Sequence, residues 1–153
     1  MHPKVKQVLE QNKIPHRILQ HSDFGEIKSA QDFSQNSGIP IKQVAKTLCV
    51  IDTSNHTYGM AILGASQRAN FSAISTLLGF GSVRMAPLDE LTLITGYEKF
   101  GTTAIATNLP TVIDEELMTE QLIYVATGTV GEELEINPKD LQNVTLARIG
   151  NII

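Results

Sequence analysis

The sequence of 153 residues contains a single cysteine, no apolar run long enough for a membrane span, and fewer basic than acidic side chains. Cys49 cannot form an internal disulfide, which is typical of a protein in a reducing compartment. The N-terminal residues lack the apolar core of a signal peptide, and a membrane-spanning helix needs roughly 18 apolar residues in a row. These absences predict a cytoplasmic protein that makes no contact with a membrane.

Several motifs of known chemistry are also missing. No lysine follows the glycines at 128 and 131, as a phosphate-binding Walker loop requires, and no Gly-x-Ser-x-Gly stretch marks a serine hydrolase. The four histidines show no metal-ligand spacing with one another or with Cys49. We therefore expect no nucleotide hydrolysis, no serine triad, no metal and no other cofactor.

The formal net charge is −4, and the charge is unevenly distributed. Residues 1–76 contain eight Lys or Arg against five Asp or Glu, and residues 77–153 contain four against eleven. Because binding along a nucleic-acid backbone depends on cations that displace counterions, this balance argues against DNA as a partner. A modest basic face in the first half could hold the end of a polyanion, or it could be a solvated surface without a partner.

Helical and extended patterns are interleaved without a repeat. Apolar spacing and end signals predict helices over residues 3–13, 27–36, 70–79, 87–96 and 138–143. Strands are expected over 14–20, 44–52, 57–63, 82–86, 102–106, 111–114, 122–126 and 133–136, with 44–52 and 57–63 as a hairpin. The order predicts an α+β fold with a mixed, partly closed, barrel-like sheet flanked by helices, in one domain over residues 1–153.

A lysine interrupts the apolar strand expected over residues 44–52. Burying the ammonium of Lys46 is costly unless an anion meets it. The side chain could reach water or a carboxylate of the protein, or it could bind a negatively charged ligand. Gly101 and Gly128 stand at the ends of expected strands, where a glycine allows close approach and leaves backbone N–H groups for an oxygen. Both glycines could equally be simple turn residues.

Four short segments occur in an order and spacing that resemble a known family. They are VAKTL at 44–48, TGY at 95–97, LPTVID at 109–114 and YVATG at 124–128. Together they resemble the YbaK-like aminoacyl-tRNA deacylases, which also occur as the editing domain inserted in bacterial prolyl-tRNA synthetases. The resemblance covers residues 3–148 and implies the partly closed barrel with flanking helices described above.

The resemblance also implies a reaction and a set of site residues. The reaction is hydrolysis of the ester in a mischarged tRNA that carries a small amino acid such as cysteine or alanine on tRNA for proline. Lys46 would hold the terminal nucleotide, Gly101 and Gly128 would present backbone donors to the ester, and the attacking group would be a water or part of the substrate. The expected substrate-binding residues are Thr47, Thr102, Thr103 and Glu133.

One loop departs from the family pattern. Where the family commonly has a proline four residues after a glycine, Gly101 is followed by Thr102, Thr103, Ala104 and Ile105. A second hypothesis is therefore a catalytically silent module of the same fold that binds tRNA or a nucleotide. A third hypothesis is a protein-interaction role for the acidic second half. The acidic balance also predicts recruitment to tRNA through a complex with an aminoacyl-tRNA synthetase.

Overall fold

The computed structural model describes all residues from 1 to 153. Its five α-helices are α1 (Pro3–Gln11), α2 (Ala30–Ser37), α3 (Phe71–Leu78), α4 (Leu88–Thr95) and α5 (Pro138–Thr145). Its eight strands are β1 (His16–Gln20), β2 (Ala45–Asp52), β3 (Thr57–Gly64), β4 (Val83–Met85), β5 (Thr111–Asp114), β6 (Ile123–Val125), β7 (Glu132–Ile136) and β8 (Arg148–Gly150). The 3-10 turns η1 (His21–Phe24), η2 (Ile41–Gln43), η3 (Lys99–Gly101) and η4 (Glu115–Thr119) lie between them. The predicted α+β class is confirmed.

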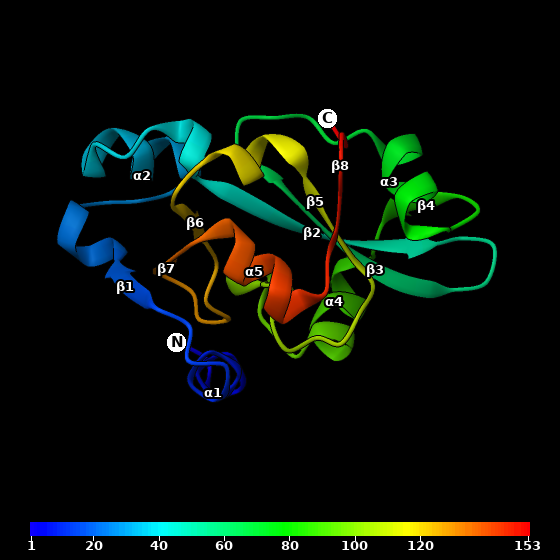
Figure 1. Cartoon of the computed structure of the whole chain (residues 1–153), viewed down its shortest axis with the longest axis horizontal. Helices are drawn as coiled ribbons and strands as arrows, with labels where there is room; N and C mark the ends of the chain where they lie inside the picture. The colour runs from blue at the N-terminus through cyan, green and yellow to red at the C-terminus, as the bar shows by residue number, and fades with distance from the viewer.

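The strands form two sheets that meet near the start of β2. One sheet has the order β4-β2-β3-β5-β8, with β5 parallel to β3 and to β8, and the other is the antiparallel set β1-β7-β6. A single bridge between Val44 and Tyr124 connects them. In Figure 1 the smaller sheet and α2 lie on one side of the molecule, α3 and β4 lie on the other, and β2 runs between them. The sheets are partly curled, but they do not form a closed barrel.

The hairpin predicted for β2 and β3 is confirmed, with Lys46 opposite Leu63 and Asp52 opposite Thr57. Alternate β2 side chains enter two different hydrophobic clusters. Cys49 and Ile51 belong to the main core, whereas Val50 packs on the opposite face in a cluster that includes residues of α3. Cys49 is 1% exposed, as expected for a small buried hydrophobe.

Local end signals explain the helix boundaries. The Asn70 side chain accepts a hydrogen bond from the Ala73 N–H at the start of α3, and Gly79 ends this helix with a φ of +72°. The Ser29 side chain accepts from the Asp32 N–H, so α2 begins at residue 30 and not at the expected residue 27. None of the five helices combines the length and apolar character needed to span a bilayer.

The strand predicted over residues 102–106 is wrong. This segment is irregular, although Thr102, Thr103, Ala104 and Ile105 are all buried. Side chains take over the role of a strand partner, since the Tyr97 hydroxyl donates to the Ile105 carbonyl at 2.6 Å and Thr103 Oγ1 accepts from the Ile105 N–H at 3.3 Å. Because the residues of this segment are buried, its sequence resembles the pattern of a buried strand. The short strand β8 was not predicted.

Candidate functional site

A cavity of about 520 Å³ lies where the two sheets meet, next to the start of α2. Its lining includes Ala45 from β2, His21 after β1, Glu133 from β7, Phe100 from η3 and Gly131 from the loop before β7. These residues are far apart in the sequence, and the pairing of β1 with β7 brings two of them together. The cavity is within the size range of small-molecule sites.

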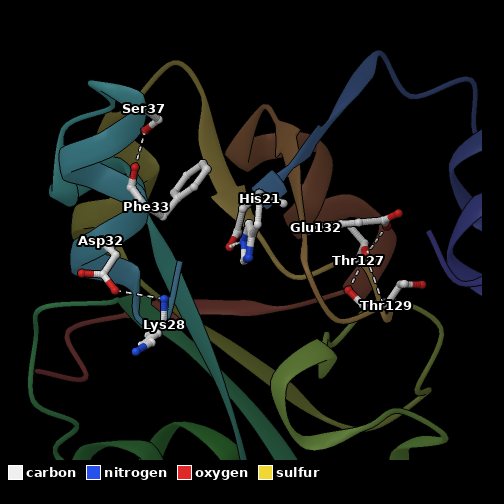
Figure 2. A network of polar contacts seen from close by, with 9 residues as sticks. His21, Lys28, Asp32, Phe33, Ser37, Thr127, Thr129 and Glu132 are labelled. Atoms are coloured by element: carbon white, nitrogen blue, oxygen red, sulfur yellow. Dashed lines mark hydrogen bonds and ion pairs between the residues drawn. The ribbon is translucent and has the colours of Figure 1, made fainter. Parts of the chain in front are cut away.

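The polar centre of the cavity is an imidazole–carboxylate pair. His21 Nε2 lies 3.0 Å from Glu133 Oε1, and the His21 backbone N–H donates to the Gly131 carbonyl at 2.9 Å. Burial raises the pKa of the Glu133 carboxyl, and the hydrogen bond and charge of His21 offset part of this shift. Figure 2 shows His21 between α2, which carries Asp32 and Phe33, and the segment with Thr127, Thr129 and Glu132. Glu133 lines the cavity, and its role in substrate binding stays a prediction.

The loop between β6 and β7 forms one wall of the cavity, and side chains hold it in place. The Thr127 hydroxyl donates to Glu132 Oε2 at 2.9 Å and accepts from the Thr129 N–H at 3.1 Å (Figure 2). The N–H groups of the next two residues, Val130 and Gly131, donate to no acceptor within the protein. Both residues line the cavity. The loop can thus offer two backbone donors to a bound oxygen.

Gly101 and Gly128 are in direct contact. The Gly128 N–H donates to the Gly101 carbonyl at 2.9 Å, and the Gly101 N–H donates to the Glu98 carbonyl at 3.0 Å. A Cβ at residue 101 would lie 3.1 Å from backbone atoms of Gly128 and Thr129. The structure therefore brings the two predicted glycines together and gives each of their N–H groups an acceptor within the protein. The N–H groups of Val130 and Gly131, by contrast, have no acceptor within the protein.

Lys46 is half-buried on β2, directly after two residues of the cavity lining. Val44 and Ala45, the two residues before it, line the cavity, but Lys46 does not. Lys46 Nζ donates to the Gln67 carbonyl at 2.6 Å and forms no ion pair. Gln67 lines a separate hollow of about 210 Å³ with the acidic residues Asp114, Glu116 and Glu120. The Lys46 ammonium thus has no carboxylate to compensate its charge.

The three threonines that the resemblance assigned to substrate binding do not line this cavity. Thr102 and Thr103 are 5% and 1% exposed. The Thr102 hydroxyl donates to the Glu98 carbonyl at 2.9 Å. Thr47 is half-buried on β2. Hydrogen bonds of the Thr102 and Thr103 hydroxyls hold the segment after η3 in place.

Sequence reasoning missed His21, Phe100 and the free N–H groups of Val130 and Gly131. The histidines had been considered only as metal ligands, and no three His, Cys, Asp or Glu side chains gather as a metal ion would require. A usable signal was the position of His21 directly after an expected strand. The partner strand that brings Glu133 to it is 112 residues away in sequence, and local patterns do not identify such a pairing.

Comparison with known proteins places this geometry in context. The sequence model of a family described as the aminoacyl-tRNA editing domain matches residues 25–144. That range contains most of the cavity wall, including Ala45, Phe100, Gly131 and Glu133. It also contains β2 through β7.

Several solved structures are similar over nearly the whole chain. The hypothetical protein APE2540 is 23% identical with a TM-score of 0.85, and the similarity covers 97% of this chain and 98% of that one. A proposed trans-editing enzyme for prolyl tRNA synthetase is 21% identical with a TM-score of 0.79, covering 99% and 98%. A structure from work on epitope grafting onto scaffold proteins is 19% identical with a TM-score of 0.81, covering 99% and 97%. At these identities the likeness shows a common fold.

Proposed function

Because this chain belongs to the aminoacyl-tRNA editing domain family, we propose that it hydrolyses the ester bond of a mischarged aminoacyl-tRNA. The observation that carries this proposal is the cavity that combines the His21–Glu133 pair with the free N–H groups of Val130 and Gly131. An aminoacyl ester has a basic α-amino group beside a carbonyl group. The cavity offers an acceptor for the first and donors for the second.

Glu133 is assigned to binding the α-ammonium group of the aminoacyl moiety. One of its oxygens, Oε1, is paired with His21, and Oε2 has no hydrogen-bond partner within the protein. Hydrogen bonds between charged groups are stronger than neutral ones, and they gain further in a mostly buried site. His21 acts as a positioning residue, since it fixes the orientation of the carboxylate.

The Val130 and Gly131 N–H groups are assigned to the ester carbonyl oxygen. A water oxygen bonds to the carbonyl carbon, negative charge develops on the carbonyl oxygen, and the bond to the ribose oxygen breaks. One proton of the water passes to the ribose oxygen, helped by a neighbouring group of the substrate, the other proton is released to solvent, and the amino acid leaves as a carboxylate. Fixed backbone donors stabilise the developing oxyanion, and a held ester needs little further help from the protein.

Lys46 is assigned to the ribose–phosphate part of the tRNA end. Its support is the half-buried ammonium without a carboxylate partner, next to Ala45 at the cavity. A lysine side chain has a flexible stem, so the ammonium can leave the Gln67 carbonyl and turn toward a phosphate. This assignment requires that substrate binding breaks the hydrogen bond between Lys46 and Gln67.

The proposed substrate carries a small amino acid, such as cysteine or alanine, on tRNA for proline. This choice follows the sequence resemblance to the prolyl-tRNA editing group. The whole chain, residues 1–153, is proposed to act as one editing domain in the cytoplasm. The net charge of −4 gives it a weak independent hold on the tRNA body, so a complex with an aminoacyl-tRNA synthetase is proposed as the route to tRNA.

A catalytically silent tRNA-binding module is the second candidate. It is favoured by the hydrogen bonds that already occupy the Gly101 and Gly128 N–H groups, in the loop that lacks the family's proline. Release of labelled amino acid from a panel of mischarged tRNAs separates the two candidates. Release above the spontaneous rate supports the hydrolase. Binding of the same tRNAs without release supports the module.

A further inference from the structure

Phe100 is an exposed aromatic residue at the edge of the cavity. It is 77% exposed, yet it belongs to the cavity lining. Its ring packs on no other aromatic ring of the protein. A single exposed apolar side chain is common on protein surfaces, but this one borders a cavity. The ring is therefore available to a flat ligand beside the cavity.

The backbone that carries Phe100 is firmly held. The N–H of Gly101 and the hydroxyl of Thr102 both donate to the Glu98 carbonyl, at 3.0 and 2.9 Å. The Gly101 carbonyl accepts from Gly128, which ties η3 to the cavity wall. On a fixed turn only the rotation of the ring itself is lost when a ligand stacks on it, because the backbone is already ordered. This is the condition under which an exposed aromatic gives useful affinity.

A cation accompanies the ring. Lys99 Nζ lies 5.0 Å from the centre of the Phe100 ring and forms no ion pair. An aromatic ring with an ammonium over one face suits a nucleotide, because a base can stack on the other face while the phosphate is attracted to the ammonium. Lys99 and Phe100 both belong to η3, and neither takes part in the ester chemistry assigned to the cavity.

We propose that Phe100 stacks on the adenine base of the tRNA's terminal adenosine, with Lys99 beside the adjoining phosphate. This inference rests on the proposed function, which places the aminoacyl ester inside the cavity. The ester is attached to the ribose of that adenosine, so the base must lie close to the cavity edge. Phe100 is the exposed aromatic side chain of the cavity lining.

The test compares two non-hydrolysable probes. One is 3′-alanylamino-3′-deoxyadenosine, and the other is the same alanylamino ribose without a base. Wild-type protein is expected to bind the adenosine probe more tightly by about fivefold or more, the contribution of one base–aromatic stack. Phe100→Leu, which keeps an apolar side chain, is expected to bind both probes alike, and Phe100→Tyr is expected to keep the preference. Leu93→Ala, at an 85% exposed apolar residue of α4, is the matched control.

The outcomes separate this inference from the proposed hydrolysis. An unchanged preference for adenosine in Phe100→Leu, or no binding of the adenosine probe by wild type, overturns the stacking role. Deacylation with an unchanged KM in Phe100→Leu also overturns it and leaves the hydrolase standing. Ring-dependent binding of the adenosine probe, without deacylation of any mischarged tRNA, supports the stacking role and removes the hydrolase.

Discussion

The His21 imidazole and the Glu133 carboxylate meet at 3.0 Å inside the cavity, although 112 residues separate them in the sequence. The antiparallel pairing of β1 with β7 places Leu19 opposite Glu133, and His21 follows two residues later. A mostly buried carboxylate is costly for the fold, which is consistent with a functional use. Glu133, Gly101 and Lys46 are the sites of four testable predictions.

Glu133→Gln is expected to weaken substrate binding. The amide keeps the shape of the side chain but removes the charge proposed to hold the α-ammonium group. A lost charge-assisted hydrogen bond predicts a rise of about tenfold or more in KM, with a smaller change in kcat. Steady-state deacylation kinetics measure both. Glu26→Gln removes the same charge from an exposed residue and serves as the control; an equal effect in both variants would contradict the assignment.

The same variant is expected to change the pH dependence of stability. Burial raises the folded-state pKa of the Glu133 carboxyl above its ordinary value of 4.5, so wild-type protein loses stability as the pH rises through that pKa. Glu133→Gln has no such loss. Denaturant unfolding should find the variant more stable than wild type at pH 7.5, with a gap that closes toward pH 4. A variant less stable than wild type at pH 7.5 would mean that the charged pair stabilises the fold.

Gly101→Ala is expected to displace the β6–β7 loop. The added Cβ would lie 3.1 Å from backbone atoms of Gly128 and Thr129. Backbone atoms cannot move aside as a flexible side chain can. We expect a loss of about 1–3 kcal/mol in the free energy of unfolding and a lower kcat. Gly64→Ala is the matched control, because its Cβ would meet the flexible Gln67 side chain at the same 3.1 Å. Equal losses in both variants would show that the loop contact is unimportant.

Lys46→Met is expected to leave the fold intact and to reduce deacylation. The methionine retains an apolar stem and removes an ammonium whose only partner is a backbone carbonyl. We expect kcat/KM to fall by about tenfold or more, because charged contacts to phosphate contribute strongly to binding. Circular dichroism and unfolding curves should match wild type. Turnover by Lys46→Met at the wild-type rate would show that Lys46 does not bind the substrate.

Local sequence signals predicted most of the fold. The Asn70 cap and the Gly79 terminator defined α3 to within one residue, and alternating apolar residues identified the β2–β3 hairpin. The error at residues 102–106 has a physical cause. That segment is buried, and side-chain hydrogen bonds such as the one from Tyr97 to Ile105 hold it in place. The local sequence pattern does not distinguish such a buried irregular segment from a strand.

The site was less predictable because it depends on tertiary contacts. The resemblance named Glu133, which lines the cavity, and it named Gly101 and Gly128 as donors, whose N–H groups have acceptors within the protein. It did not show that the Lys46 ammonium donates to the Gln67 carbonyl. His21 and Val130 escaped notice because an isolated histidine and a free N–H group leave no periodic pattern in the sequence.

The most direct test of the central proposal is the rate at which wild-type protein releases amino acid from tRNA for proline charged with alanine, cysteine or proline. The hydrolase predicts that alanine or cysteine is released well above the spontaneous rate while proline is retained. It also predicts that Glu133→Gln and Lys46→Met slow this release. Release no faster than in buffer for every charged tRNA, by protein that still binds those tRNAs, would contradict it.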